Sequence, residues 1–276
     1  MSTKTKFDVS RLAVTTGGAG DPAVFVHGFG SGKLVWEDVC QGLADVFSFY
    51  AIDLPGSGES PAPKHFQYTL EHFADVLTDF IVMKDLEKLT LVGASLGAAV
   101  VLLALLRNRE ELTPRVRALC LIDAIAYPQD LPFFVEILQT PVLGPAALNF
   151  PSFVQALPAI FLPPGYARYY GRKKVREALI KTARLMDGER LAPYVKRLKT
   201  IQLPTLVIWG RKDGIVPLRL GRRLVRDLPN ARLMVIEHCD HWPHQECPAE
   251  VIAALKEFAR RTRDDVRPLE PAQQHT

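Results

Sequence analysis

A serine flanked by glycines stands where one apolar segment of this chain gives way to the next. The run Gly93-Ala94-Ser95-Leu96-Gly97 follows an apolar segment and opens a second one. This is the G-x-S-x-G pattern of a serine held on a sharp turn between a strand and a helix. The turn lifts the hydroxyl clear of the sheet, and the helix N-terminus directs N–H groups at the reacting oxygen. We therefore predict that Ser95 is a nucleophile.

A serine hydroxyl needs a base, and the chain offers a base and an acid further along. Asp213 and His241 each follow one of the later apolar segments. We predict that His241 takes the proton of Ser95 and that Asp213 orients the imidazole and stabilises its charged form. Two alternatives stay open. Asp123, which also ends an apolar segment, could replace Asp213, and His244 could replace His241 or contact the substrate.

Acyl transfer to a serine creates an oxyanion that needs hydrogen-bond donors. The run His27-Gly28-Phe29-Gly30 follows an early apolar segment, and its glycines allow the backbone to approach closely. We predict that the backbone N–H groups of Phe29 and Leu96 form the oxyanion hole. Gly28, Phe29 and Trp242 are predicted to contact the substrate.

Other motifs indicate structure more than chemistry. The run Asp53–Ser60 contains two glycines, but the lysine of a phosphate-binding loop does not follow them, so we interpret it as a tight structural loop. His27 is interpreted as a residue that holds its own loop. The cysteines and histidines lack the spacing of metal ligands, so we predict neither a metal site nor a cofactor.

The elements that must position these residues alternate between strand and helix patterns. Short, almost continuous apolar segments are typical of strands buried on both faces of a parallel sheet, and they occur at 23–26, 47–52, 89–92, 117–122, 204–209 and 232–236. Apolar residues at helical spacing separate them, at 34–43, 70–83, 96–106, 219–228 and 249–260. This alternation predicts an α/β fold with a mostly parallel, doubly wound sheet, and an antiparallel edge strand within 7–16.

The alternation breaks between residues 124 and 200, where prolines and aromatic residues accumulate without a strand pattern. We predict a helical insertion at 124–200, a core formed by 1–123 and 201–263, and a disordered tail at 264–276. Between Tyr166 and Thr200 there are eleven Lys or Arg against three acidic residues. This stretch is either a solvated outer face or a docking face for an acidic partner.

Five runs, taken in order, resemble the landmark loops of the α/β-hydrolase superfamily: His27–Gly30, Asp53–Ser60, Gly93–Gly97, Trp209–Pro217 and Asp240–Pro248. The resemblance implies an α/β-hydrolase fold in which the insertion is a helical cap between strands 6 and 7, with the substrate between cap and core. It implies a serine hydrolase similar to carboxylesterases. Such an enzyme would cleave a carboxylic ester or thioester of a small to medium apolar acyl group through an acyl-enzyme.

A second subfamily is similar more weakly. The pair His241-Trp242 resembles the meta-cleavage product hydrolases, which break carbon–carbon bonds with the same three residue types. However, the loop Phe29-Gly30-Ser31-Gly32 and the Ala94 that precedes the serine depart from their pattern. Carbon–carbon bond hydrolysis is therefore the alternative reaction. A ligand-binding protein without turnover is disfavoured by the complete set of serine, histidine and aspartate.

Composition limits the partners and the setting. A net charge of +4 from 34 basic and 30 acidic residues is too small to argue for nucleic acid. No apolar run approaches the roughly 20 residues of a membrane span, and the N-terminus lacks the apolar core of a signal peptide. Four cysteines without a CxxC pair are expected to be reduced thiols, which favours a cytoplasmic enzyme. The expected partner is a small-molecule ester, with an acidic carrier protein as an alternative suggested by the basic stretch.

Overall fold

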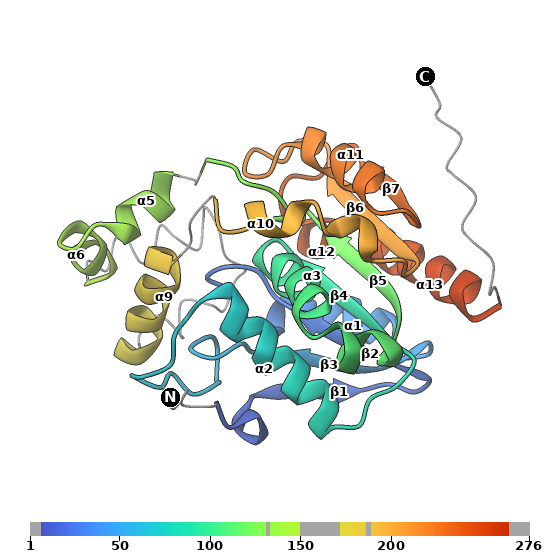
Figure 1. The fold of residues 1–276 in the computed structure, drawn as a ribbon, viewed down its shortest axis with the longest axis horizontal. Coiled ribbons are helices and arrows are strands. Elements are labelled where there is room, and N and C mark those ends of the chain that lie inside the picture. The colour runs from blue at the N-terminus through green and yellow to red at the C-terminus, as the bar shows by residue number, and fades with distance from the viewer. Residues whose placement is uncertain (1–6, 131–132, 150–171, 186–188, 265–276) are drawn as a thin grey trace.

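The computed structural model describes residues 7–130, 133–149, 172–185 and 189–264, and within them a seven-stranded sheet runs through the centre of the molecule (Figure 1). Its strands lie in the spatial order β1-β3-β2-β4-β5-β6-β7. Along the chain they are β1 (Val14–Gly17), β2 (Asp21–Val26), β3 (Phe47–Ile52), β4 (Leu89–Ala94), β5 (Val116–Ile122), β6 (Thr205–Gly210) and β7 (Ala231–Ile236). Only β1 pairs antiparallel, with β3, and the other neighbours are parallel. The predicted fold class is confirmed.

The edge strand β1, Val14–Gly17, occupies the end of the predicted segment 7–16 and extends one residue beyond it. Residues Val9–Arg11 form a 3₁₀ turn instead, because the side chain of Asp8 accepts a hydrogen bond from the N–H of Ser10 at 3.1 Å. Such local side-chain bonds compete with the ladder of a sheet. The antiparallel pairing therefore begins only at Val14, opposite Ile52.

Helices cover both faces of the sheet (Figure 1). The helices of the core are α1 (Glu37–Gly42), α2 (Leu70–Met83), α3 (Leu96–Arg107), α4 (Arg109–Leu112), α11 (Leu218–Asp227), α12 (Pro243–Glu246) and α13 (Pro248–Asp264). Short 3₁₀ turns lie at Lys33–Trp36, Thr113–Arg115 and Leu198–Thr200. Apolar residues of α2, α3 and α11 form one core cluster with the strands, and those of α1 and α13 form a second cluster.

The strands supply both clusters because successive side chains of a strand point to opposite faces. In β5, Leu119 and Leu121 belong to the first cluster, whereas Cys120 and Ile122 belong to the second. All of these side chains are fully buried. This double burial is the physical reason that the strands were recognisable as continuous apolar runs.

The bounds of α2 coincide with the predicted segment 70–83. The side chain of Thr69 caps the helix by accepting a hydrogen bond from the N–H of His72 at 3.3 Å. Buried Phe73, Leu77 and Phe80 then repeat at the spacing of one helical face. Capping residue and apolar spacing agree here, which is why the prediction was accurate.

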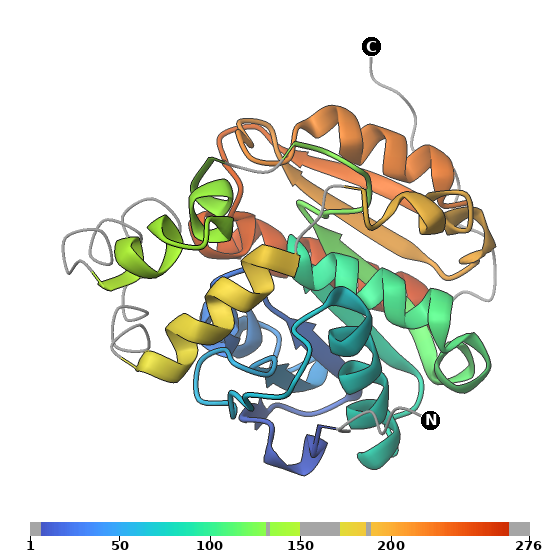
Figure 2. The same cartoon turned by 60° about the vertical axis from the view of Figure 1, so that its left-hand side comes forward.

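The described part of the insertion contains helices and no strand. These are α5 (Phe133–Gln139), α6 (Leu143–Asn149), α9 (Lys173–Leu185) and α10 (Ala192–Val195). Helix α9 packs against α5 and α6, and Figure 2 shows the three grouped beside the core. The resemblance predicted an insertion between strands 6 and 7. In this seven-stranded sheet the insertion follows β5 and precedes β6. The tail 265–276, predicted to be disordered, lies outside the described residues.

Helix α9 touches the core through the loop that follows β3. The side chain of Lys181 donates a hydrogen bond to the carbonyl of Lys64 at 2.8 Å. The side chain of Arg172 donates to the carbonyl of Gly58 at 3.4 Å. A Cβ added at Gly56 would lie 2.5 Å from the Cβ of Ala178, so helix and loop approach closely. In the parts of the chain that the structure describes, no helix is both long enough and apolar enough to cross a membrane.

Candidate active site

The register of the central strands collects the candidate residues at one edge of the sheet. Val26 pairs with Gly93, and Ile122 pairs with both Ala94 and Ile208. The chain therefore leaves β2, β4 and β5 at almost the same level. Loops at the carboxyl ends of parallel strands form the usual site of an open α/β sheet.

Ser95 occupies a strained turn at this edge. Its φ of 52° and ψ of −116° lie where residues with a side chain are rarely found. Such a conformation costs on the order of 1–3 kcal/mol and persists only where neighbouring structure enforces it. A Cβ added at Gly93 would lie 2.7 Å from the backbone N of Ala98, and one at Gly97 would collide with the carbonyl of Val26. The predicted strand–turn–helix is present, and its two glycines are sterically required.

The structure brings the three predicted catalytic residues into one hydrogen-bonded chain. The Oγ of Ser95 lies 3.0 Å from Nε2 of His241. Nδ1 of His241 lies 2.8 Å from Oδ2 of Asp213. The serine, histidine and aspartate have relative exposures of 4%, 3% and 8%, so these three hydrogen-bonded residues are shielded from solvent.

The hydrogen bonds around Asp213 assign the tautomer of the histidine. A carboxylate can only accept, so Nδ1 of His241 carries a proton and Nε2 is the acceptor for the hydroxyl of Ser95. The other oxygen of Asp213, Oδ1, accepts from the N–H groups of Ile215 and Val216, each at 2.8 Å. These donors hold the carboxylate in place and favour its charged form. The arrangement can remove a proton from the serine and stabilise the resulting imidazolium.

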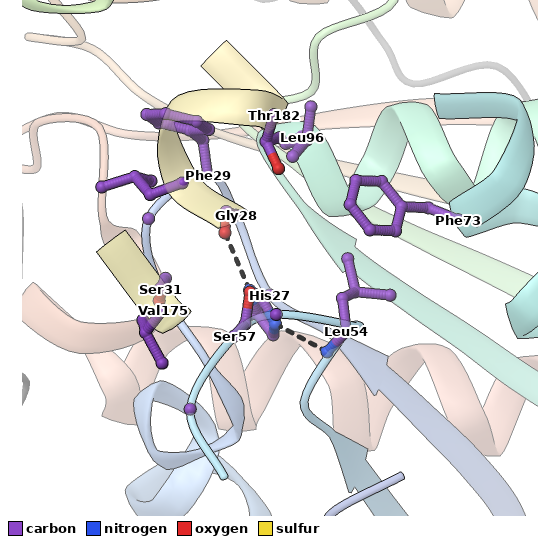
Figure 3. A pocket seen from close by; sticks show the side chains of 14 residues that line it. His27, Gly28, Phe29, Ser31, Leu54, Ser57, Phe73, Leu96, Val175 and Thr182 are labelled. Atoms are coloured by element: carbon purple, nitrogen blue, oxygen red, sulfur yellow. Dashed lines mark hydrogen bonds between the residues drawn. The ribbon is translucent and has the colours of Figure 1, made fainter. Parts of the chain in front are cut away.

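The predicted oxyanion donors belong to two segments that meet near the serine. Leu96 is the first residue of α3, where N–H groups have no acceptor within the helix. The loop after β2 approaches closely, since a Cβ added at Gly28 would lie 3.3 Å from the Cβ of Ser95. Phe29 and Leu96 both line a pocket that Gly28 also lines (Figure 3). Phe29 and Leu96 remain the predicted backbone donors.

The pocket is mostly apolar and extends under α9 (Figure 3). Phe29, Leu54, Phe73 and Leu96 supply the wall from the core. Helix α9 supplies residues that the sequence analysis did not single out, namely Val175, Leu179 and Thr182. Their spacing along one helical face was a signal for this role, but it did not reveal which surface the face would cover.

The aromatic residues of the insertion were candidates for the wall of a substrate pocket. Those between residues 150 and 170 lie outside the described residues. Phe133 is 75% exposed and points to solvent in place of lining the pocket. Among the described residues, the apolar wall comes from the core and from α9.

His27 and the Asp53–Ser60 loop support the site structurally, as interpreted from the sequence. Nδ1 of His27 donates to the carbonyl of Gly28 at 2.8 Å, and Nε2 accepts from the N–H of Leu54 at 3.0 Å (Figure 3). Burial lowers the pKa of His27 below its ordinary value, which keeps this ring neutral. Asp53 accepts from the backbone N–H and the ammonium group of Lys33 at 2.6 and 3.2 Å. The loop that follows β3 is thus tied to the oxyanion loop.

The two residues beyond His241 differ in their placement. The indole of Trp242 packs edge-on against the imidazole of His241, with ring centroids 4.4 Å apart, and it also lies near Gly28. His244 is buried and stacks on Trp36, with centroids 4.4 Å apart. Burial and then the charge of His241 lower its pKa to about 3, so His244 is neutral. It is neither the base nor a residue of the described pocket.

Of the two candidate acids, Asp213 is the one that contacts the histidine. Asp123 lies next to it: one ligand atom each of Asp123, Asp213 and His241 lie within 4.8 Å of one another. Three such groups could in principle hold a metal ion. However, the hydrogen bond between His241 and Asp213 already uses one atom of each.

The expectation of reduced cysteines is wrong for one pair. Cys239 and Cys247 form a disulfide, with Cα atoms 6.7 Å apart, whereas Cys40 and Cys120 are free and buried. Between the paired cysteines the chain turns back through α12, and a separation of eight residues does not reveal this turn. The bond closes the loop that carries His241. The cysteine-based argument for a cytoplasmic setting therefore loses its support, because disulfides are rare there.

The fold and the site define a hydrolase class: a doubly wound sheet with a serine elbow, a histidine and an aspartate at its carboxyl edge. The family model of the alpha/beta hydrolase fold matches residues 21–248, and the chain belongs to this family. A pimeloyl-[acyl-carrier protein] methyl ester esterase of Neisseria meningitidis serogroup C is 30% identical over 248 residues, which are 83% of this chain and 90% of the relative.

Solved structures agree with the family assignment. A thermophilic esterase from Thermogutta terrifontis is similar with a TM-score of 0.72 and 25% identity, over 91% of this chain and 93% of that chain. A meta-cleavage product hydrolase from Pseudomonas fluorescens IP01 has a TM-score of 0.75 at 23% identity, over 90% of this chain and 94% of that chain, and this likeness concerns the fold alone. The predicted resemblance to both groups is confirmed at the level of fold.

Proposed function

We propose that this protein hydrolyses carboxylic esters, thioesters included, of a small to medium apolar acyl group through a covalent acyl-enzyme. The observation that carries the proposal is the buried relay from Ser95 through His241 to Asp213, with contacts of 3.0 and 2.8 Å. A serine in such a relay is activated for attack on a carbonyl carbon.

In the first half-reaction, the Oγ of Ser95 attacks the carbonyl carbon while Nε2 of His241 takes the hydroxyl proton. The carbonyl oxygen becomes an oxyanion, which the N–H groups of Phe29 and Leu96 stabilise. Removing one such donor from a serine hydrolase typically costs about 10²–10³ in rate. The intermediate then collapses, the bond to the alkoxy or thiolate group breaks, and His241 gives its proton to that leaving group.

The second half-reaction repeats these steps with water. His241 removes a proton from the water as its oxygen attacks the acyl carbon, and the same donors stabilise the second oxyanion. Collapse breaks the bond to Ser95, which recovers its proton from His241, and the carboxylic acid leaves. Asp213 stays ionised throughout and stabilises the imidazolium in both halves.

The pocket favours an apolar acyl group. Its walls include the side chains of Phe29, Leu54, Phe73 and Leu96 and the face of α9. Burial of each methylene against such side chains contributes about 0.8 kcal/mol. The acyl chain therefore extends from Ser95 toward α9.

Hydrolysis of p-nitrophenyl acetate, butyrate and octanoate tests this proposal. We expect turnover by the wild type, loss of more than about a thousandfold in Ser95→Ala, and no change in the remote variant Ser48→Ala. A fluorophosphonate should label the wild type at Ser95 only. Undiminished turnover in Ser95→Ala would refute the assignment. Turnover of a dienone but not of any ester would replace it with the carbon–carbon alternative.

A second form of substrate, an acyl group attached to an acidic carrier protein, is favoured by the charge on α9. Lys173 and Lys174 are exposed on this helix, whose Val175 and Leu179 line the pocket. The relative that is 30% identical is named as an esterase of a carrier-bound methyl ester. An acidic carrier on the outer face of α9 would present its acyl chain near the pocket.

Salt dependence separates the two forms of substrate. Charges on the surface are screened within about 8–10 Å at physiological ionic strength. Hydrolysis of an ester on an acyl carrier protein should therefore slow steeply between 20 and 300 mM NaCl and in Lys173→Glu/Lys174→Glu, whereas hydrolysis of p-nitrophenyl butyrate should not. Lys84→Glu, at the end of α2, is the matched control. A flat salt profile for the carrier substrate would exclude charge-guided docking.

A further inference from the structure

Asp123 is a buried acid next to the relay that the proposed mechanism does not use. It follows β5, has no exposed surface, and adopts a φ of 43° that a residue with a side chain rarely takes. Its N–H donates to the carbonyl of Ile208 at 3.0 Å, and its Oδ1 accepts from the N–H of Gly210 at 3.0 Å. Its second oxygen, Oδ2, is buried and receives no hydrogen from any group in the described residues.

This carboxyl group faces a second carboxyl group at short range. One carboxylate oxygen of Asp123, one of Asp213 and one ring nitrogen of His241 all lie within 4.8 Å of one another. Two carboxylates that share a buried site cannot both be ionised without a large electrostatic cost, so one of them holds a proton.

The hydrogen bonds decide which of the two is protonated. Asp213 accepts from two backbone N–H groups and from His241, and each of these bonds favours the charged form. In the described part of the chain, Asp123 accepts from one backbone N–H, that of Gly210. The proton therefore resides on Asp123, and it explains the oxygen that receives no hydrogen: a protonated Oδ2 is itself a donor.

The charged groups that face Asp123 agree with this assignment. Burial, followed by the charge of Asp213, raises the pKa of Asp123 well above its ordinary value. The hydrogen bond from the N–H of Gly210 acts in the opposite direction, and the charge of Glu246 raises the pKa of Asp123 further. His241 is a further titratable group within 4.8 Å. The direction of this pKa shift agrees with the proton on Asp123 that the hydrogen bonds indicate.

We propose that Asp123 is a positioning residue: its protonated carboxyl group donates a hydrogen bond to the carboxylate of Asp213 and thereby holds that carboxylate against His241. This inference rests on the proposed function, because it assigns a role relative to the relay.

Two substitutions at this position separate the hydrogen bond from the charge. Asp123→Asn has the same shape, and its amide still donates to Asp213 while its oxygen accepts from Gly210. Asp123→Leu has a similar size but no polar atom. We expect Asn to keep kcat for p-nitrophenyl butyrate within about threefold, and Leu to lower kcat by at least about tenfold with KM nearly unchanged, as for one lost bond to a charged group.

The acidic limb of the pH profile tests the protonation state. A negative charge beside His241 would stabilise the imidazolium, so its removal would move the limb to lower pH by about one unit or more. We expect no movement in Asp123→Asn. Movement to lower pH would show that Asp123 is ionised in the wild type and would overturn the proposal. A tenfold loss of kcat in Asn, or full activity in folded Asp123→Leu, would overturn it as well.

A measurement without turnover keeps this inference distinct from the proposed function. The pKa of the His241 imidazole can be followed by NMR in the wild type and in Asp123→Asn, with His241→Gln to assign the signal. Equal values in the two proteins support a neutral Asp123 even if no ester is hydrolysed, and a lower value in Asn contradicts it. If Asp123→Leu does not fold, as judged by circular dichroism, the Asn variant still decides the question.

Discussion

Substitution of Gly97 by alanine should disable the oxyanion hole without touching any side chain of the relay. Gly97 is the second residue of α3, directly after Leu96. A Cβ at this position would collide with the carbonyl oxygen of Val26 and lie 2.6 Å from that of His27. Both obstacles are backbone atoms at the end of β2, so no side chain can rotate away to make room.

The size of the effect follows from the contact. The added Cβ would lie 2.7 Å from the carbonyl carbon of Val26. Non-bonded carbon atoms keep at least about 3.5 Å, so the start of α3 must move away from β2 by about 0.8 Å. One proposed donor, at Leu96, moves with the helix, while the other, at Phe29, stays with the loop after β2. A misplacement of about 1 Å can cost about a hundredfold in rate, and the overpacking itself costs about 1–3 kcal/mol of stability.

Steady-state kinetics with p-nitrophenyl butyrate and a thermal melt measure both quantities. We expect Gly97→Ala to lose about a hundredfold in kcat while part of the protein remains folded at 25 °C. Gly214→Ala is the matched control, because a Cβ at Gly214 meets nothing within 4 Å. If Gly97→Ala keeps kcat within about threefold of the wild type, the close approach of α3 and β2 does not set the donor geometry.

Three further predictions concern the acid, the disulfide and a buried histidine. Asp213→Asn should lower kcat by about 10⁴ with little change in KM, because an amide offers the wrong hydrogen-bond pattern to Nδ1 of His241, and a loss below tenfold would point to another acid. Cys239→Ser/Cys247→Ser should lower the free energy of unfolding by about 2.6 kcal/mol, because that is the loop-closure entropy expected for a loop of this length. The reductant tris(2-carboxyethyl)phosphine should lower the melting temperature of the wild type but not that of the variant. Burial lowers the pKa of His244 from 6.5 to about 3. Between these two pH values the unfolded chain binds a proton that the folded chain does not, so the stability of the fold falls as the pH falls. Urea unfolding should show that His244→Phe removes about 1.4 kcal/mol per pH unit of this acid sensitivity between pH 6 and 4, whereas the exposed His65→Gln leaves it unchanged; equal slopes in His244→Phe and the wild type would contradict the burial argument.

The strands, the long helices and the serine elbow could be predicted because each rests on local physics. A strand buried on both faces is almost continuously apolar, as β5 is from Ala118 to Ile122, and Thr69 caps the start of α2. The elbow needs glycine at 93 and 97 because backbone atoms crowd both positions. These requirements act on neighbours in the chain, so they leave a readable pattern.

Contacts across long chain distances could not be predicted in the same way. The covering of the pocket by α9 depends on how the insertion docks, and apolar spacing alone does not say which surface a helical face will meet. The pairing of Cys239 with Cys247 depends on the turn between them, which the spacing hides.

The sequence by itself determined the fold class, the serine, and the short list of bases and acids, because strand ends and glycine turns are local features. Only the tertiary structure decided between the acids. Asp123 and Asp213 both follow strands, but the hydrogen bonds of their loops differ, and Asp213 receives the N–H groups that favour its charge while Asp123 receives one. Which carboxyl group is ionised is a property of the surroundings that the folded chain assembles, and no run of neighbouring residues encodes it.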